Sequence, residues 1–196
     1  MGERKNERQR LLSLVGDLIL DEGVSGQSLS SLARKIGSNN RMVLYYFGSK
    51  EDLLAEASLE AFIRFPLLRQ MTTRLTSDPG TLEQRLDAAW LQISDPANIP
   101  YLRLFFEAFG VASHSPEKNQ SLLTTMGTDW VQALVGVLRA DGFDEPTARL
   151  VTVQILALWR GLQFDLLRGT PRDTLDAAHP VAIRGLLTAN RALTAL

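Results

Sequence analysis

Cysteine is absent from this chain of 196 residues, which excludes disulfide bonds, thiolate metal sites and cysteine nucleophiles. Histidine occurs only twice, and the two are too far apart in sequence to indicate a metal site. We therefore expect neither a metal nor a cofactor. No uninterrupted apolar run approaches the ~20 residues of a membrane-spanning helix. The N-terminal MGERKNERQR leads into a mixed helix and not into the apolar core of a signal peptide. These absences predict a cytoplasmic protein without a membrane partner.

Net charge is also nearly absent, at −1, so the whole chain gives no reason to expect a nucleic acid. The charge is unevenly distributed, however. Residues 1–50 hold eight basic and five acidic side chains, a net charge of +3, and the remainder therefore carries −4. This asymmetry is a weak indication of an anionic partner for the first quarter of the chain, and ordinary scatter explains it equally well.

Apolar residues recur with helical period along almost the whole chain, and no segment alternates as a strand would. The pattern predicts an all-α fold of about nine helices. Pro66 is expected to end or kink a helix, and a long helix is expected from Pro116 to about Ala140. Pro180 predicts that the last helix begins only near His179.

Spacing, charge and helix length all change near residue 50. We therefore expect a functional boundary there, with one domain over 1–50 and a helical domain over 51–196.

A short helix is predicted to begin after Ser28, a favourable N-cap, with one apolar stripe formed by Leu29, Leu32, Ala33 and Ile36. Gly37 ends it, because glycine adopts the positive φ of a tight turn without steric strain. Asn39 can cap the next helix, over 40–47. Two short helices joined by a glycine turn indicate a helix-turn-helix, whose second helix enters the DNA major groove.

The second of these helices divides into two faces at about 100° per residue. The inward face holds Met42, Val43 and Tyr46, and the outward face holds Asn40, Arg41, Leu44 and Tyr45. An amide, a guanidinium, an apolar group and a phenol are the groups that read base edges. The Tyr46 hydroxyl, Lys50 at the start of a further helix and Ser28 are placed to contact phosphates. The predicted DNA-contacting residues are Ser28, Asn39, Asn40, Arg41, Leu44, Tyr45, Tyr46 and Lys50.

The segment SLSSLARKIGSNNRMVLYYFGSKEDLLAEA resembles the DNA-binding segment of the TetR family of bacterial transcription regulators. The match lies in Leu32-Ala33, Ile36-Gly37, Tyr45-Tyr46-Phe47, Ser49-Lys50 and Leu53 and extends over about residues 8–57. The family usually has an apolar residue at the position of Ser38, tyrosine at Leu44 and proline at Gly48. These departures concern the base-reading surface and not the fold.

In TetR-like proteins the remaining helices enclose a small-molecule cavity, and the resemblance implies one here, lined mostly by apolar groups. The candidates for its lining are Trp90, Phe105, Phe106, Phe109, His114, Met126, Trp130 and Trp159. For each residue taken alone, a place in the core is the simpler interpretation. Arg103 and Glu107, four residues apart on one predicted helix, indicate a surface ion pair.

The helix predicted over 145–168 is apolar on nearly all sides, so two of its faces must be buried against other helices. A four-helix interface with a second subunit would supply this cover, in the way that the family dimerises, and full burial within one subunit is the alternative. The candidate interface residues are Val151, Ile155, Leu158, Leu162, Ile183, Leu186 and Leu187.

The sequence thus predicts a homodimeric regulator that binds a near-palindromic double-stranded operator, a repressor released by an unidentified, largely apolar small-molecule effector. Alternatives are an activator or ligand-independent regulator of the same fold, or a helical protein that binds small molecules. No catalytic constellation stands out, so an enzyme is not expected.

Overall fold

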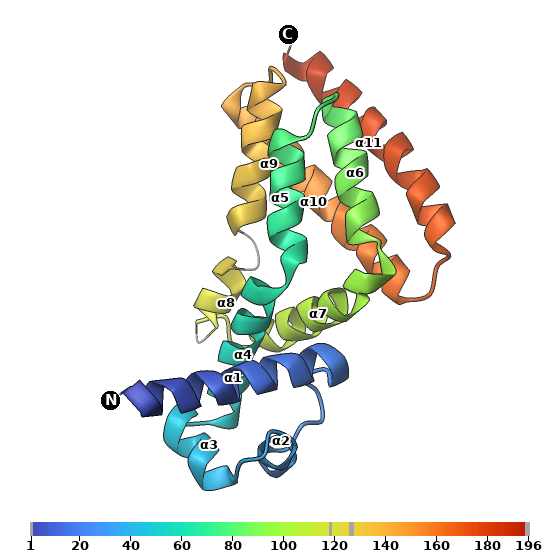
Figure 1. Ribbon diagram of the computed structural model, residues 1–196. Helices are drawn as coiled ribbons and strands as arrows, with labels where there is room; N and C mark the ends of the chain where they lie inside the picture. Colours follow the sequence, from blue (N-terminus) through green and yellow to red (C-terminus); the bar gives the residue numbers. More distant parts are fainter. Residues whose placement is uncertain (1, 118, 126–127, 195–196) are drawn as a thin grey trace. The chain divides into compact units, whose positions relative to one another are not determined.

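The computed structural model describes residues 2–117, 119–125 and 128–194, and all regular structure in these residues is helical (Figure 1). The all-α prediction is confirmed, although the described residues form eleven α-helices and one 3-10 turn where about nine helices were expected. In chain order the elements are α1 (Gly2–Glu22), α2 (Leu29–Lys35), α3 (Asn40–Phe47), α4 (Lys50–Arg64), α5 (Pro66–Ser77), α6 (Leu82–Ile93), η1 (Pro96–Asn98), α7 (Ile99–Ser113), α8 (Gln120–Thr125), α9 (Thr128–Ala140), α10 (Glu145–Leu167) and α11 (Arg172–Thr194).

The helices form two compact units. Unit 1 comprises Met1–Phe65 and Pro100–Met126, and unit 2 comprises Pro66–Ile99 and Gly127–Leu196. This division differs from the expected boundary after residue 50, because α4 packs against α1 and α3 and therefore belongs to the same unit. The functional boundary at residue 50 stays a prediction.

The core of unit 1 is the contact of α1 with α4, to which α3 also packs. Its completely buried apolar side chains are Leu11, Val15, Ile19, Leu32, Val43, Leu53, Ala57 and Ala61. Gly16 lies at this contact, where a Cβ would stand only 2.7 Å from Nη2 of Arg64. That guanidinium crosses from α4 to pair with Asp17 at 2.9 Å. Small residues on both helices therefore allow the close approach.

The predicted break at Pro66 is confirmed. Phe65 has extended backbone (φ −72°, ψ 124°), and Pro66 starts the next helix. Proline disfavours helical backbone at the preceding residue and is well tolerated in the first helical position.

The predicted start of this helix at Pro116 is wrong, because Pro116 and Glu117 lie in a turn and α8 begins only at Gln120. Just before α8, the Asn119 side-chain amide donates to the Ser115 carbonyl at 3.0 Å. Helix α9 ends at Ala140, as predicted, and residues 126–127 lie outside the described residues. Periodicity shows that a segment is helical but not where the helix begins.

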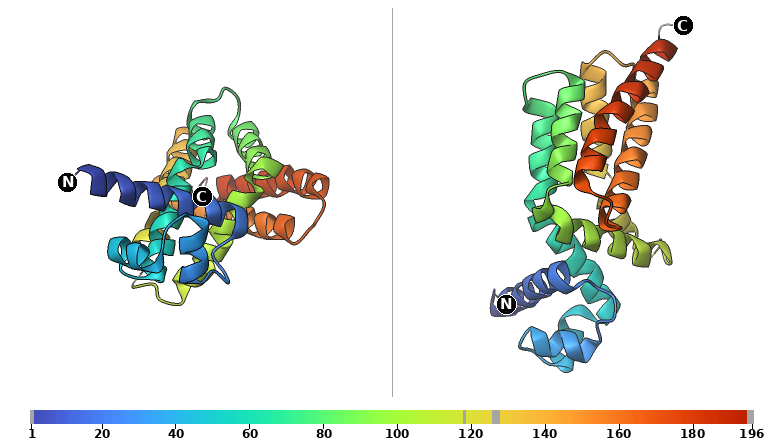
Figure 2. Two further views of the ribbon diagram at one scale, coloured as in Figure 1. Left: turned by 60° about the horizontal axis from the view of Figure 1, so that its bottom comes forward. Right: turned by 90° about the vertical axis from the view of Figure 1, so that its right-hand side faces the viewer.

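By length and mean hydropathy, α10 could cross a membrane, and 33% of its most apolar stretch is buried within the chain. The sequence expectation counted uninterrupted apolar runs and therefore missed it. The core helix of a soluble protein passes the same test. One face of α10, with Val151, Ile155 and Trp159, is buried in unit 2, and the helix packs beside α9 and α11 (Figure 2).

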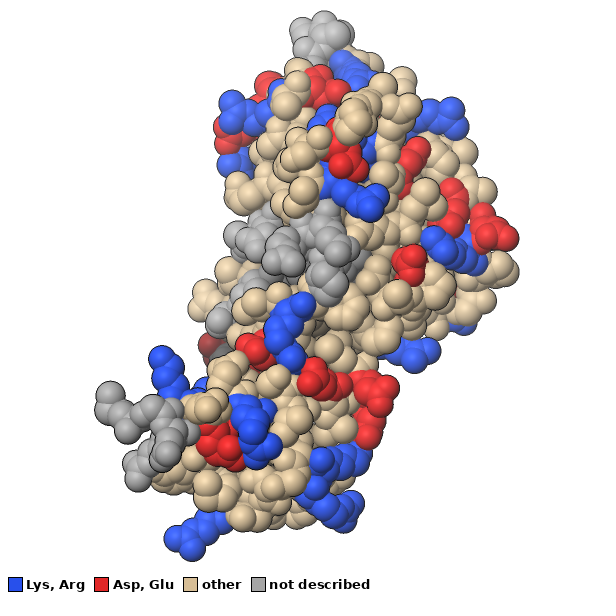
Figure 3. Space-filling model, viewed as in Figure 1, with Lys and Arg blue, Asp and Glu red and all other residues tan. Residues whose placement is uncertain are grey.

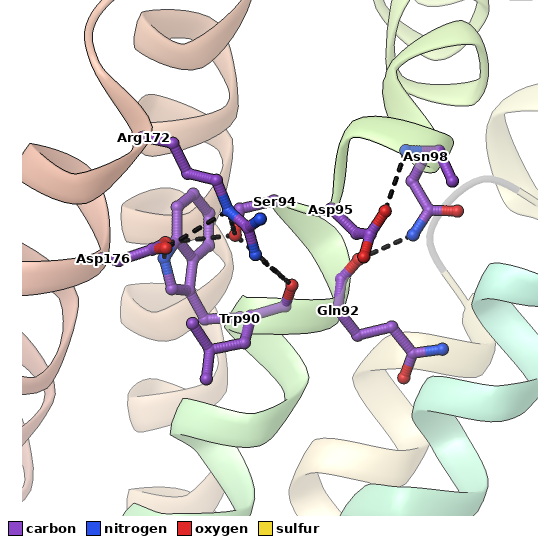
Figure 4. Close-up of polar contacts among 9 residues, drawn as sticks. Trp90, Gln92, Ser94, Asp95, Asn98, Arg172 and Asp176 are labelled. Carbon is purple, nitrogen blue, oxygen red and sulfur yellow. Dashed lines mark hydrogen bonds and ion pairs between the residues drawn. The ribbon is translucent and has the colours of Figure 1, made fainter.

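The last helix begins at Arg172 and not near His179, so Pro180 lies inside α11. An internal proline removes one helical hydrogen bond and costs about 3 kcal/mol. The turns before it are held by side chains. Asp176 accepts from the Trp90 indole at 2.7 Å and from the Ser94 hydroxyl at 3.1 Å, and pairs with Arg172 at 3.2 Å (Figure 4).

Hydrogen bonds to a charged group contribute about 1.5–3 kcal/mol each when they are shielded from water. Two or three such bonds to Asp176 therefore offset the proline penalty. Tertiary contacts override the local preference that placed the start of the helix at His179.

His179 is completely buried in unit 2 between two tryptophans. Its Nε2 accepts from the Trp159 indole at 2.9 Å, so the proton is on Nδ1, which donates to Asp87 at 3.0 Å. The Trp90 ring stacks on the imidazole at 5.5 Å between centroids. Burial lowers the pKa of His179 below its ordinary value of 6.5, and the nearby Asp87 carboxylate opposes this shift.

This shift predicts a stability that depends on pH. Because the pKa is lower in the folded state, the full stability is present above about pH 6.5 and is lost as the pH falls below it. We expect the unfolding free energy, measured by urea denaturation, to fall from pH 7 to pH 5 less steeply in His179→Gln, which retains an acceptor, than in the unmodified protein. Equal slopes for the two proteins would contradict the burial of a neutral imidazole.

Candidate nucleic-acid interface

Helix α2 and the turn after it follow directly from their polar and glycine residues. The Ser28 hydroxyl accepts from the Ser31 N–H at 3.1 Å and caps the start of the helix. At its end, Gly37 has φ +67°, and the Ser38 N–H bonds back to the Ala33 carbonyl at 2.8 Å. This closed turn fixes the direction in which the chain enters α3.

Helix α3 occupies residues 40–47, as predicted, and is capped by Asn39, whose side-chain oxygen accepts from the Met42 N–H at 3.0 Å. The Asn40 amide donates to the Ser30 hydroxyl of α2 at 2.9 Å. Asn40 is exposed, and its side-chain oxygen and second N–H make no hydrogen bond that involves a described residue; these are the groups that an asparagine uses toward adenine. Ser30 was not anticipated from the sequence.

The two faces of α3 lie as predicted. Val43 is completely buried, whereas Leu44 is 42% exposed and Tyr45 61% exposed. Tyr46 is half-buried and meets Tyr45 edge to face at 5.1 Å. Two adjacent tyrosines therefore have different surroundings, one in solvent and one against the domain.

Cationic side chains stand out on the surface formed by α2 and α3 (Figure 3). Arg34 and Arg41 are exposed, and their side chains make no hydrogen bond or ion pair to any described residue. Lys35 is engaged by Glu22 of α1. Lys50, at the first position of α4, reaches Glu51 only at 3.6 Å. Exposed guanidinium groups without a partner among the described residues suit phosphate oxygens.

Two residues that matter to this surface were missed from the sequence. Arg8 of α1 contacts both α3 and α4, with Glu56 as its partner 48 positions away. Glu107 of α7 accepts from the backbone N–H groups of Val24, at 2.8 Å, and Ser25 in the loop before α2. Since neither pair is local, no spacing in the sequence could reveal it.

Glu107 also explains a glycine. Gly23 has φ +83°, and a Cβ there would stand 2.7 Å from the Glu107 carboxylate. The expected pair of Glu107 with Arg103 is replaced by these loop contacts, and Arg103 is exposed. A carboxylate of α7 thus fixes the segment that leads into α2.

The predicted cavity residues fall in both units. Trp90 and Trp159 are 1% exposed and engage Asp176 and His179, so they are core residues of unit 2. Trp130 is half-buried and meets Trp159 edge to face.

In unit 1, Phe105 and Phe106 of α7 are half-buried, Phe109 is 50% exposed, and His114 is exposed. The His114 ring is bound to the Gly110 carbonyl at 2.7 Å. Met126 lies outside the described residues. A ligand site shared by these aromatic residues stays a prediction.

Unit 1 contains a half-open hollow of about 710 Å³. It is bordered by the loop before α2, the first half of α4, the end of α7 and α8, and none of the predicted ligand residues lines it. In the described part of the chain, no group of three His, Asp or Glu side chains is placed to hold a metal ion.

Four of the seven expected interface residues are completely buried within the chain, namely Val151, Ile155, Ile183 and Leu187. They belong to the core of unit 2 and leave no surface for a partner, so their assignment to a dimer interface is corrected. Leu158, Leu162 and Leu186 are half-buried. The exposed apolar residues of α10 are instead Leu150, Val153 and Phe164.

Several solved structures are similar to the chain along nearly all of its length. A transcriptional regulator from Rhodococcus sp. Rha1 is 22% identical, with a TM-score of 0.72 over 93% of this chain and 96% of that one. A TetR-family transcriptional regulator from Cytophaga hutchinsonii is 14% identical, with a TM-score of 0.72 over 94% and 96%. A protein described as a transcriptional regulator from Saccharomonospora viridis, in complex with choline, is 21% identical, with a TM-score of 0.74 over 92% and 96%.

No family profile matches the sequence, and no curated protein sequence does. The likeness to the Cytophaga hutchinsonii structure shows that the chain has the fold of TetR-family transcriptional regulators. It agrees with the resemblance seen in the sequence around α2 and α3.

The Glu107 contacts predict a local effect. Glu107→Ala removes the acceptor of two backbone N–H groups, so we expect faster hydrogen exchange at Val24 and Ser25 and a fall of about 1–2 kcal/mol in unfolding free energy. Arg103→Ala, one turn earlier on α7, is the control and is expected to change neither. Unchanged exchange at both amides in Glu107→Ala would show that the loop is held by other contacts.

Proposed function

We propose that this chain is a DNA-binding transcriptional regulator, a repressor that leaves its operator when a small, largely apolar effector binds. The carrying observation is the exposed face of α3, where Asn40, Arg41, Leu44 and Tyr45 project from a helix fixed by caps and by a glycine turn. These side chains match the donors, acceptors and methyl groups of the major groove. The TetR-type fold supports the same assignment.

Backbone contacts complete the proposed interface. Lys50 and the N–H groups at the start of α4 bind one phosphate, and Ser28 with the start of α2 binds another. Ser28 and Asn39 are first of all helix caps, in which their side-chain oxygens accept hydrogen bonds. They contribute to DNA binding through the donors that capping does not use, the Ser28 hydroxyl hydrogen and the Asn39 amide N–H groups. Tyr46 reaches a phosphate with its hydroxyl from the half-buried side of α3.

The regulator acts as a homodimer in this proposal, through exposed stripes of α10 and α11. On α10 the stripe consists of Leu150, Val153, Ala157, Gly161 and Phe164, and on α11 of Ala178, Val181, Gly185 and Ala189, all exposed. The spacings of three and four residues place each set on one helix face. Apolar residues flanked by small ones suit close helix packing, and burying this stripe against a second copy removes it from water.

The effector part of the proposal draws support from a structural relative. The Saccharomonospora viridis protein was solved with choline bound. Aromatic side chains suit such organic ligands, and here Phe105 and Phe106 of α7 are half-buried and not fully enclosed. An effector displaces the repressor only as far as it binds the DNA-free conformation more tightly. A protein with this role works in the bacterial cytoplasm, beside the chromosome, and is not an enzyme.

DNA binding is tested by the double variant Arg41→Ala/Tyr45→Ala. Duplexes are first selected from genomic DNA by binding to the unmodified protein, and affinity is then measured by fluorescence anisotropy over a range of salt concentrations. The variant is expected to bind about 100-fold more weakly, because two base-reading contacts are lost. The unmodified protein should lose affinity steeply with salt.

Arg149→Ala is the matched control, since Arg149 is an exposed arginine whose partner among the described residues is Glu145 of its own helix. It should bind like the unmodified protein. Failure to select any duplex, or full affinity in the folded double variant, would exclude this function.

The dimer is tested by Val153→Glu/Val181→Glu, which places charges on both exposed stripes. We expect the mass measured by light scattering to halve, because like carboxylates would meet across the two-fold axis. Phe109→Glu replaces a comparably exposed apolar residue of α7 and should leave the mass unchanged. If the Val153→Glu/Val181→Glu protein still has the mass of a dimer, the dimer interface lies elsewhere on the chain.

A further inference from the structure

The guanidinium of Arg8 joins three helices of unit 1. Nη2 donates to both carboxylate oxygens of Glu56 on α4, at 2.7 and 2.6 Å. Nε donates to the backbone carbonyl of Tyr46 in α3 at 3.3 Å. The same group lies over the Phe47 ring, 4.7 Å from its centroid. One side chain of α1 therefore contacts the end of α3 and anchors it to α4.

The chemistry of this contact suits an arginine. The last four carbonyls of a helix have no partner within the helix, and cations are favourable near that end. A planar guanidinium can serve a carboxylate, a carbonyl and an aromatic face together, whereas the ammonium of lysine is a compact point charge. Glu56 holds Arg8 in the orientation in which all three contacts form.

The contact matters because α3 has only eight residues. An isolated helix of two turns is not stable in water, so its direction depends on the contacts at its ends. At its start it is held by the Asn39 cap and the bond between Asn40 and Ser30. At its end, Tyr46 carries the bond from Arg8, and its ring touches that of the exposed Tyr45.

We propose that Arg8, held by Glu56, is a positioning residue that sets the direction of α3 and so the placement of Arg41 and Tyr45 on DNA. The proposal rests on the DNA-binding function proposed above. Arg8 is a partly exposed cation, so direct binding of a phosphate is the competing role, and the two roles predict different results.

The experiment compares Arg8→Met with Glu56→Gln, using the duplex selected by the unmodified protein. If Arg8 positions α3, both variants bind about five- to tenfold more weakly, because Arg8→Met removes its bonds to Tyr46 and Glu56 and Glu56→Gln removes the ion pair that holds Arg8 in place. The salt dependence of binding keeps its slope, since no phosphate contact is lost. Arg8→Lys, which retains the ion pair, should recover part of the affinity.

Two controls calibrate these results. Arg10→Ala removes an arginine of the same helix whose partner, Glu7, is three residues away, and it should bind normally. Lys50→Ala removes a proposed phosphate contact, and its salt slope should fall by about one unit. A similar fall in slope for Arg8→Met, with normal binding by Glu56→Gln, would make Arg8 a phosphate ligand and overturn the positioning role.

Hydrogen exchange tests the same proposal without DNA. In Arg8→Met, the backbone amides of Val43 to Phe47 should exchange about tenfold faster, while the central amides of α1 and α4 keep their protection. A uniform loss of protection would indicate a merely structural role, and no change at α3 would overturn the proposal. Because this measurement needs no operator, it can fail while the DNA-binding function stands, and the reverse also holds.

Discussion

Helices α2 and α3 are too short to hold a direction by themselves, and the packing of α1 against α4 gives them one. Gly16 and small residues on α4 let the two long helices meet closely, and Arg64 ties them at one end. Val43 of α3 is completely buried in the same core. Arg8 and Glu107 then bind backbone groups on either side of the helix-turn-helix. The exposed face of α3 depends on this support.

Much of unit 1 could be predicted from the sequence, because its signals are local. Asn39 and Gly48 delimit α3, and a helical wheel separates Tyr45 from Tyr46 correctly. The partners of Arg8 and Glu107 could not be predicted, since they are 48 and 82–83 positions away. Periodicity describes one helix at a time and carries no information about which distant residue a charged side chain meets.

Unit 2 shows the limits of the same reasoning. A helix that is apolar nearly all round does not reveal which face meets its own core, so Val151 was chosen where its neighbour Leu150 is exposed. The start of α11 was misplaced because proline preference is a local quantity. Asp176 and His179 form hydrogen bonds with side chains of α6 and α10. The stabilisation from these bonds outweighs the cost of placing Pro180 inside the helix.

For the function proposed above, the exposed stripe of α10 would have a consequence for gene control. If operator binding needs two chains and the stripe joins them, the concentration of the active species rises with the square of the concentration of free subunits at low expression. A twofold change in the amount of protein would then alter operator occupancy about fourfold in the dilute limit. The apolar residues along one helix would thereby set how sharply the regulated genes respond to the copy number of their own regulator.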